Sequence, residues 1–210
     1  MIEIKNVKKN FGKTMIIDDI SASFSDGKIV GIIGRNGCGK TVLFKMICGL
    51  MLPTSGTIVV NDEIVGKDVD FPSSIGVIIE SPQFTGNLDA KDTLMELAVI
   101  KNKIGREEVE QTLKKVGLNP DEKKKVSKYS LGMRQRLGIA QAIMENPKVL
   151  ILDEPMNGLD KNGVEDMRKL FSQLKEEGKT ILLASHNRED IEVLCDEVYE
   201  MEEGKLTPFN

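Results

Sequence analysis

Residues 34–41 of the chain read Gly-Arg-Asn-Gly-Cys-Gly-Lys-Thr and fit the pattern G-x-x-x-x-G-K-[ST]. The apolar run at 29–33 before this stretch is typical of a buried strand, and residues 41–47 suit the first turns of a helix. Three glycines, at 34, 37 and 39, allow the backbone to turn tightly and to point its N–H groups inward. The strand, loop and helix together predict a cradle for a triphosphate.

Two side chains at the end of this loop carry the expected chemistry. Lys40 would reach the β- and γ-phosphates, and the hydroxyl of Thr41 would bind Mg²⁺. The N-terminus of the following helix adds partial positive charge at the same place. A glycine turn with a chance lysine is the alternative, and both flanking elements argue against it. We therefore assign to nucleotide binding Gly34, Arg35, Asn36, Gly37, Cys38, Gly39, Lys40, Thr41 and Val42.

Composition narrows the class of protein. The 210 residues, 40% hydrophobic and 30% charged, suffice for one well-buried domain. A net charge of -4 gives no indication of non-specific nucleic-acid binding, so we expect no nucleic-acid partner. The three cysteines are odd in number and lack metal-site spacing, which favours reduced thiols in the cytosol. No apolar stretch reaches the length of about 18 residues that a membrane-spanning helix needs.

The hydrophobic pattern predicts an α/β fold with two additions. Residues 2–24 look like antiparallel strands, and the apolar runs at 149–152 and 180–184 predict strands that are covered on both faces. From about residue 81, helix-period patterns replace the β-branched clusters. We predict one domain, residues 1–210: a core of mostly parallel sheet with helices on both faces (1–80 and 131–210), which includes an N-terminal antiparallel β subdomain, and an inserted helical subdomain (81–130).

A second group of candidate residues follows the strand at 149–152. Asp153 would hold Mg²⁺, and Glu154 would polarise the attacking water. Both carboxylates come at the carboxyl end of a strand, where open α/β sheets bind ligands. An ordinary acidic turn would explain them if the loop at 34–41 were absent.

The only histidine, His186, follows the strand at 180–184. If that strand runs parallel to the strand ending at Glu154, His186 lies near the γ-phosphate as a hydrogen-bond donor. A lone histidine is otherwise a structural or surface residue.

A last stretch, residues 129–135, reads Tyr-Ser-Leu-Gly-Met-Arg-Gln. Ser130 suits the N-cap of a helix. No local argument brings this stretch to the glycine loop of the same chain.

With these four stretches in this order, the sequence resembles the ATP-binding cassette (ABC) ATPases, the nucleotide-binding subunits of ABC transporters. The resemblance extends over essentially the whole chain and implies hydrolysis of ATP to ADP and phosphate with Mg²⁺. It also implies that Phe11 stacks on adenine and that residues 130–135 form the signature motif. By the same resemblance, residues 157–160 line a dimer interface and His186 is the switch histidine.

In this family two cassettes close head to tail, as a homodimer or a heterodimer. The resemblance thus implies that Ser130, Gly132 and Gln135 of one chain cover the ATP held by the other. It also implies a separate integral-membrane permease, docked on the helical subdomain and driven by closure of the dimer. The chain would then lie in the bacterial cytosol, peripherally on the cytoplasmic face of the cell membrane.

Three positions depart from the usual family pattern. Glu80 stands where a magnesium-binding glutamine is usual, Leu131 replaces a glycine of the signature, and Val42 replaces a second hydroxyl. Glu80 can still ligate the metal. Its context, Ile-Glu-Ser-Pro at 79–82, resembles the bacitracin- and lantibiotic-export branch, so we expect an exporter of a peptide antibiotic or of several drugs.

Two other classes compete with this interpretation. A soluble, non-transport ABC-type ATPase acting on ribosomes would usually carry two cassettes, and one acting on chromosomes would carry long coiled-coil arms. A GTPase or small-molecule kinase would not explain residues 130–135, and the guanine motif N-K-x-D is absent.

Overall fold

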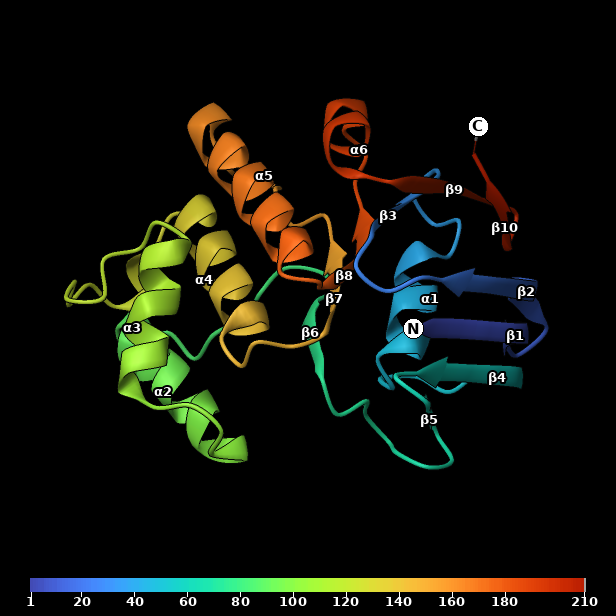
Figure 1. Ribbon diagram of the computed structural model, residues 1–210, viewed down its shortest axis with the longest axis horizontal. Coiled ribbons are helices and arrows are strands. Elements are labelled where there is room, and N and C mark those ends of the chain that lie inside the picture. Colours follow the sequence, from blue (N-terminus) through green and yellow to red (C-terminus); the bar gives the residue numbers. More distant parts are fainter. Residues whose placement is uncertain (210) are drawn as a thin grey trace.

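The computed structural model describes residues 1–209, where two β-sheets and six α-helices form stacked layers (Figure 1). In chain order the elements are β1 (Ile2–Phe11), β2 (Thr14–Phe24), β3 (Ile29–Ile33), α1 (Lys40–Ile47), β4 (Ser55–Val60), β5 (Glu63–Ile64), β6 (Ile75–Ile78), α2 (Ala90–Lys101), α3 (Arg106–Lys115), the 3-10 helix η1 (Val126–Lys128), α4 (Leu131–Ile143), β7 (Val149–Asp153), α5 (Lys161–Glu176), β8 (Thr180–Ala184), α6 (Arg188–Leu194), β9 (Glu197–Glu202) and β10 (Lys205–Pro208).

The first sheet is antiparallel and has the strand order β2-β1-β4-β5. Ile2 lies opposite both Phe24 of β2 and Val60 of β4. The antiparallel strands expected over residues 2–24 are present, although the alternation of apolar and polar residues breaks after Val7. Register shifts, the first between Ile4 and Val7, let β1 continue to Phe11.

The second sheet has the order β10-β9-β3-β8-β7-β6, with β9, β3, β8, β7 and β6 parallel and β10 antiparallel at the edge. Its strands face two cores. Val149 and Ile151 of β7 pack toward α1 and the antiparallel sheet, whereas Leu150 and Leu152 pack among the remaining helices. Figure 1 shows α1 on one side of this sheet and α4 and α5 on the other. The predicted fold class is confirmed.

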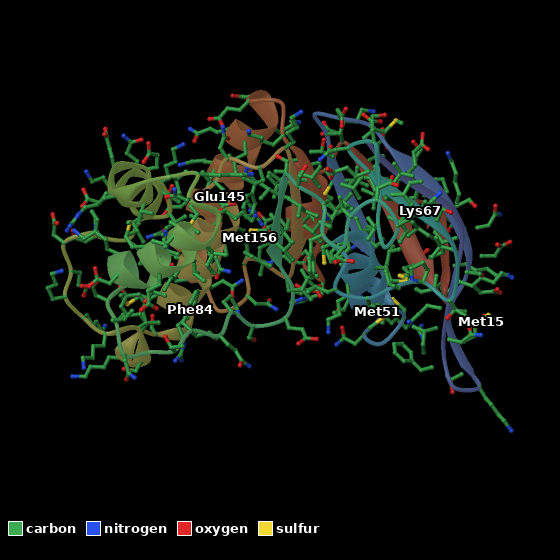
Figure 2. All side chains as sticks on the ribbon, turned by 90° about the horizontal axis from the view of Figure 1, so that it is seen from below. Met15, Met51, Lys67, Phe84, Glu145 and Met156 are labelled. Atoms are coloured by element: carbon green, nitrogen blue, oxygen red, sulfur yellow. The ribbon has the colours of Figure 1, made fainter. Side chains whose placement is uncertain are left out.

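Helices α2 and α3 pack on each other, and α3 also packs on α4. Leu94, Val109, Leu113 and Leu137 are fully buried between these three helices. In Figure 2 Phe84 lies on this helical side, whereas Met15 marks the opposite end of the molecule. The structure contains, within residues 1–209, no helix long and apolar enough to cross a membrane.

Candidate functional site

The glycine loop joins the carboxyl end of β3 to α1. Two of its glycines, Gly34 and Gly37, lie in different surroundings. Gly34 has φ +147°, and a Cβ there would stand 2.3 Å from the carbonyl oxygen of Met201, so only glycine permits this close approach. Gly37 has φ +81°, and a Cβ there would meet nothing within 4 Å. The backbone at 37 therefore faces open space and is accessible to a ligand.

The N-terminus of α1 is suited to an anion. Its N-cap residue is Gly39, and no side chain caps the helix, so its first N–H groups are left for another acceptor. The Nζ of Lys40 donates to the carbonyl oxygens of Gly34 at 2.7 Å and Arg35 at 3.1 Å. The lysine is thus held over the loop by bonds that phosphate oxygens can replace.

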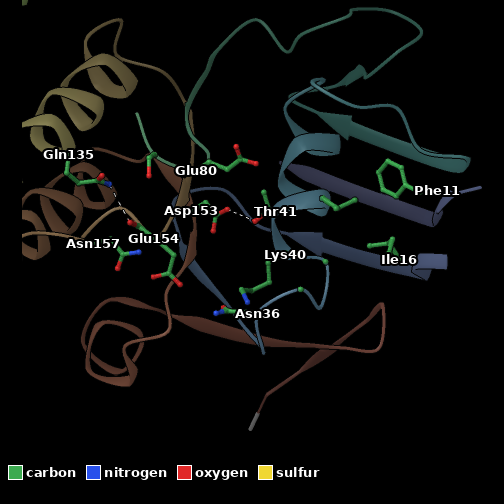
Figure 3. A pocket seen from close by; sticks show the side chains of 14 residues that line it. Phe11, Ile16, Asn36, Lys40, Thr41, Glu80, Gln135, Asp153, Glu154 and Asn157 are labelled. Carbon is green, nitrogen blue, oxygen red and sulfur yellow. Dashed lines mark hydrogen bonds between the residues drawn. The ribbon is translucent and has the colours of Figure 1, made fainter. Parts of the chain in front are cut away.

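A cavity of about 480 Å³ opens over this loop (Figure 3). We call it the main cavity. Its size is that of a typical small-molecule site. Its lining comes from both sheets and from α4: Phe11, Ile16, Asn36, Gly37, Gly39, Lys40, Thr41, Val42, Glu80, Ser81, Gln135, Asp153, Glu154 and Asn157.

Parallel pairing brings the two carboxylates to the loop. Asp153 pairs with Ala184 at the end of β8, and β8 in turn pairs with β3, so three strands end at one edge of the sheet. Thr41 Oγ1 donates to Asp153 Oδ2 at 2.7 Å, the contact that Figure 3 marks between them. Residues 112 positions apart thus meet where the sequence predicted a metal site.

Glu154 has a left-handed backbone, φ +51°, and its N–H donates to the carbonyl of Ala184 at 2.9 Å. Its carboxylate lies 2.8 Å from Nδ1 of His186. The predicted parallel arrangement of β7 and β8, which was the reason to bring His186 toward Glu154, is confirmed. A carboxylate in contact with an imidazole, beside open space, can accept a proton from water.

A buried ion pair between Arg168 and Asp190 stabilises the segment that carries His186. Asp190 receives hydrogen bonds from Arg168 Nε at 2.9 Å and Nη2 at 2.5 Å, and from Ser185 Oγ at 3.1 Å. Hydrogen bonds to Glu189 and then to Asp190 raise the pKa of the Arg168 guanidinium, although desolvation opposes them. This network joins α5 and α6 at the residues that flank His186.

Gln135 reaches the main cavity from α4. Its Nε2 donates to the carbonyl of Pro155 at 2.8 Å and that of Glu154 at 3.4 Å. The side chain is buried. Within one chain, it therefore ties α4 to the loop that carries Glu154.

Several predicted residues lie outside the main cavity. Ser130 and Gly132 line another cavity, the α4 cavity, of about 640 Å³, together with Gly158, Leu159 and Asp160. Gly34, Arg35 and His186 line a further one, behind the loop. The Sγ of Cys38 lies 3.8 Å from Lys40 Nζ.

Three lining residues were not predicted as site residues. Ile16 lies on β2, in the other sheet, so no local sequence pattern predicts that it lines the cavity. Ser81 follows Glu80, and Asn157 begins the stretch 157–160 that the resemblance already singled out. Phe11, on the neighbouring strand β1, is 48% exposed and has the Nζ of Lys9 at 5.2 Å from its ring centroid. The exposed part of this side chain can stack on a base.

The chemistry of the main cavity fits a magnesium-bound nucleotide. Thr41 and Asp153 offer two oxygen atoms, and no group of three or more His, Cys, Asp or Glu side chains in the described part of the chain forms a metal cage. Mg²⁺ is typically bound by one or two carboxylates, with phosphate oxygens and water completing its shell. The loop, Lys40 and these two oxygens together match that need.

The sequence is similar to known ABC proteins. The family model for "ABC transporter" matches residues 17–157. The uncharacterized ABC transporter ATP-binding protein YybJ of Bacillus subtilis is 44% identical over 98% of this chain and 94% of its own length. The bacitracin transport ATP-binding protein BcrA of Enterococcus faecalis is 42% identical, over 98% and 68%. The lantibiotic transport ATP-binding protein SrtF of Streptococcus pyogenes is 39% identical, over 98% and 89%.

Solved structures agree on the fold. An ATP-binding subunit of an ABC transporter superposes with a TM-score of 0.89 at 25% identity, covering 100% of this chain and 90% of the other. A dimeric bacterial ABC transporter cassette gives 0.87 at 24% identity, covering 98% and 96%, and bears on the fold alone.

Proposed function

This chain belongs to the ABC transporter family of ATP-binding proteins, and we propose that it hydrolyses ATP to ADP and phosphate to power an exporter whose membrane-spanning subunit is a separate protein. One observation carries the proposal. Lys40 and Thr41 from the glycine loop share a single cavity with Asp153 and Glu154 from the end of β7. Hydrolysis of ATP needs groups that bind the phosphates and, beside them, a group that accepts a proton from water.

The proposed roles follow from the contacts. Lys40 exchanges its loop carbonyls for phosphate oxygens, and Phe11 stacks on the adenine. Thr41 and Asp153, with Glu80 beside them, hold Mg²⁺, which supplies positive charge against the phosphates when bound. Glu154 accepts the proton of the attacking water. His186 orients Glu154 through Nδ1, at 2.8 Å, and its other ring nitrogen is left for the terminal phosphate.

The α4 cavity supports action as a dimer. Ser130 and Gly132 line it with residues 158–160, apart from the cavity of their own chain. A second cassette, identical or different, placed head to tail would bring its glycine loop to this surface and bury the nucleotide between the two chains. ATP binding would close the pair, and hydrolysis would open it.

The direction of transport is inferred from relatives. Two of them are named for bacitracin and lantibiotic transport, and Glu80 fits that branch. We propose export of a peptide antibiotic or of several drugs. A soluble ABC-type ATPase is the competing function.

An apolar groove supports docking of a membrane subunit. The groove, of about 490 Å³, is lined by Leu50, Phe71, Ile75, Val77 and Lys103, among others. Phe71 is 59% exposed. Ile75 and Val77 belong to β6, which leads to Glu80, so a partner seated here, beside the helical subdomain of residues 81–130, would act on the nucleotide site. The chain would then lie on the cytoplasmic face of the bacterial membrane.

Equilibrium binding of ATP to the purified chain tests this function. Lys40→Ala should abolish both binding and phosphate release, because it removes the one ammonium group that lines the main cavity. Lys114→Ala is the matched control, since Lys114 is exposed on α3. Unaltered ATP binding by Lys40→Ala, at unchanged thermal stability, would refute the proposal.

A further inference from the structure

The main cavity has an unusual charge problem. Three carboxylates line it, those of Glu80, Asp153 and Glu154, but only one ammonium group, that of Lys40. A triphosphate entering here meets three negative groups, each of which opposes binding unless a positive group offsets it. Asp153 contacts Thr41 and Glu154 contacts His186.

Glu80 has a partner that does not line the cavity. The Nζ of Lys45 donates to Glu80 Oε1 at 2.5 Å. Lys45 lies on α1, four positions after Thr41, and residues four apart share one face of a helix. In Figure 3 Glu80 lies above the Thr41–Asp153 contact, close to α1. One helix therefore presents a hydroxyl to the metal position and an ammonium group to Glu80.

The local backbone favours this pairing. Glu80 has φ +62°, a left-handed conformation that is uncommon for residues other than glycine and asparagine. It lies in a bend, two residues after β6 ends at Ile78. The ion pair is partly exposed, with 29% of the Lys45 side chain and 65% of the Glu80 side chain accessible. A pair this exposed adds little to folding stability, so its removal should leave the thermal unfolding of the chain nearly unchanged.

We propose that Lys45 is a positioning and charge-compensating residue: it holds the Glu80 carboxylate against α1 and offsets its charge, so that a triphosphate can enter a site lined by three carboxylates. The inference rests on the proposed function, because it concerns nucleotide entering the same cavity. It makes Lys45 and Glu80 one unit. A chain with glutamine at position 80 would not need a cation at 45.

A double-mutant cycle read by equilibrium binding of a fluorescent ATP analogue, with EDTA and then with Mg²⁺, tests the unit. Lys45→Gln should weaken binding roughly five- to tenfold, the effect of about one uncompensated charge. Lys45→Arg should restore the affinity. The double variant Lys45→Gln/Glu80→Gln should bind like Glu80→Gln alone. Thermal unfolding without nucleotide should change little in all four variants, since the pair is exposed.

The controls separate this inference from the function on which it rests. Lys114→Gln, an exposed lysine removed from α3, should bind like wild type. Failure of the wild-type chain to bind ATP would refute the proposed function itself. If wild type binds, Lys40→Ala does not, and the separate effects of Lys45→Gln and Glu80→Gln on the affinity simply add, then only the Lys45–Glu80 unit is overturned. Binding of the analogue by Lys45→Gln with the wild-type affinity would overturn that unit as well.

Discussion

Replacing Glu154 by glutamine should stop hydrolysis while leaving ATP binding intact. The carboxylate lies 2.8 Å from Nδ1 of His186, and an amide of the same length preserves the shape of this contact. Glutamine also keeps a side chain at the left-handed position, φ +51°, whereas glycine would relax the backbone. The substitution thus removes little more than the negative charge and the ability to accept a proton.

The size of the effect follows from that loss. A positioned proton acceptor contributes about 10²- to 10⁴-fold to a rate, which corresponds to about 2.7–5.4 kcal/mol in activation free energy. Phosphate release at saturating ATP should fall by this factor. ATP should bind at least as tightly as in wild type, because a negative charge beside the triphosphate has been removed.

Two measurements check this prediction. Phosphate release gives the rate, and size-exclusion chromatography with and without ATP reports whether the variant accumulates as a closed dimer. The control is Glu176→Gln, which alters an exposed glutamate at the end of α5. Hydrolysis by Glu154→Gln at the wild-type rate would refute the role assigned to Glu154 and the reasoning from its position.

The remaining predictions concern the base platform, the thiols and the loop support. Phe11→Ala should weaken ATP binding about tenfold, since stacking contributes about 1–3 kcal/mol per base, whereas Phe11→Tyr should not; an unchanged dissociation constant for Phe11→Ala would contradict the stacking. Burial raises the pKa of the Cys195 thiol to about 12, so iodoacetamide should label Cys195 slowly at pH 8 and faster as the pH rises. ATP should protect Cys38, in the glycine loop, from the same reagent. Peptide mapping measures both rates of labelling, and fast labelling of Cys195 at pH 8 would contradict its burial. Asp190→Asn should lower the free energy of unfolding by about 2 kcal/mol, because the Asp190 side chain is 3% exposed and forms an ion pair with Arg168. Urea denaturation measures this free energy. An unchanged value would show that the buried pair is not needed for stability.

Local patterns explain why the nucleotide loop could be predicted from sequence. The apolar run at 29–33, the glycines and Lys40 are neighbours in the chain, so one short window contains the strand, the loop and the helix. The fold class followed in the same way, because β7 and β8 are buried on both faces and read as uninterrupted apolar runs. The roles of the individual site residues remain predictions.

Contacts between segments that are far apart in the chain could not be predicted from the sequence. Ile16 lines the main cavity only because the antiparallel sheet packs over α1. The Lys45–Glu80 pair joins residues 35 positions apart, and no periodicity indicates it. The resemblance implies that Gln135 covers the ATP of a second chain, which remains a prediction; in the single chain its amide donates to the carbonyl of Pro155, in the loop after β7.

Co-purification is the most direct test of whether this chain works with a membrane-spanning subunit. Native membranes would be solubilised in mild detergent, and this chain pulled down through an affinity tag. A multi-spanning membrane protein should be recovered in stoichiometric amount. A matched pull-down of the Phe71→Asp variant should lose this protein, because the substitution places a charge in the apolar groove. Recovery of the chain only from the soluble fraction, without a membrane partner, would contradict the transporter assignment and favour a soluble ABC-type ATPase.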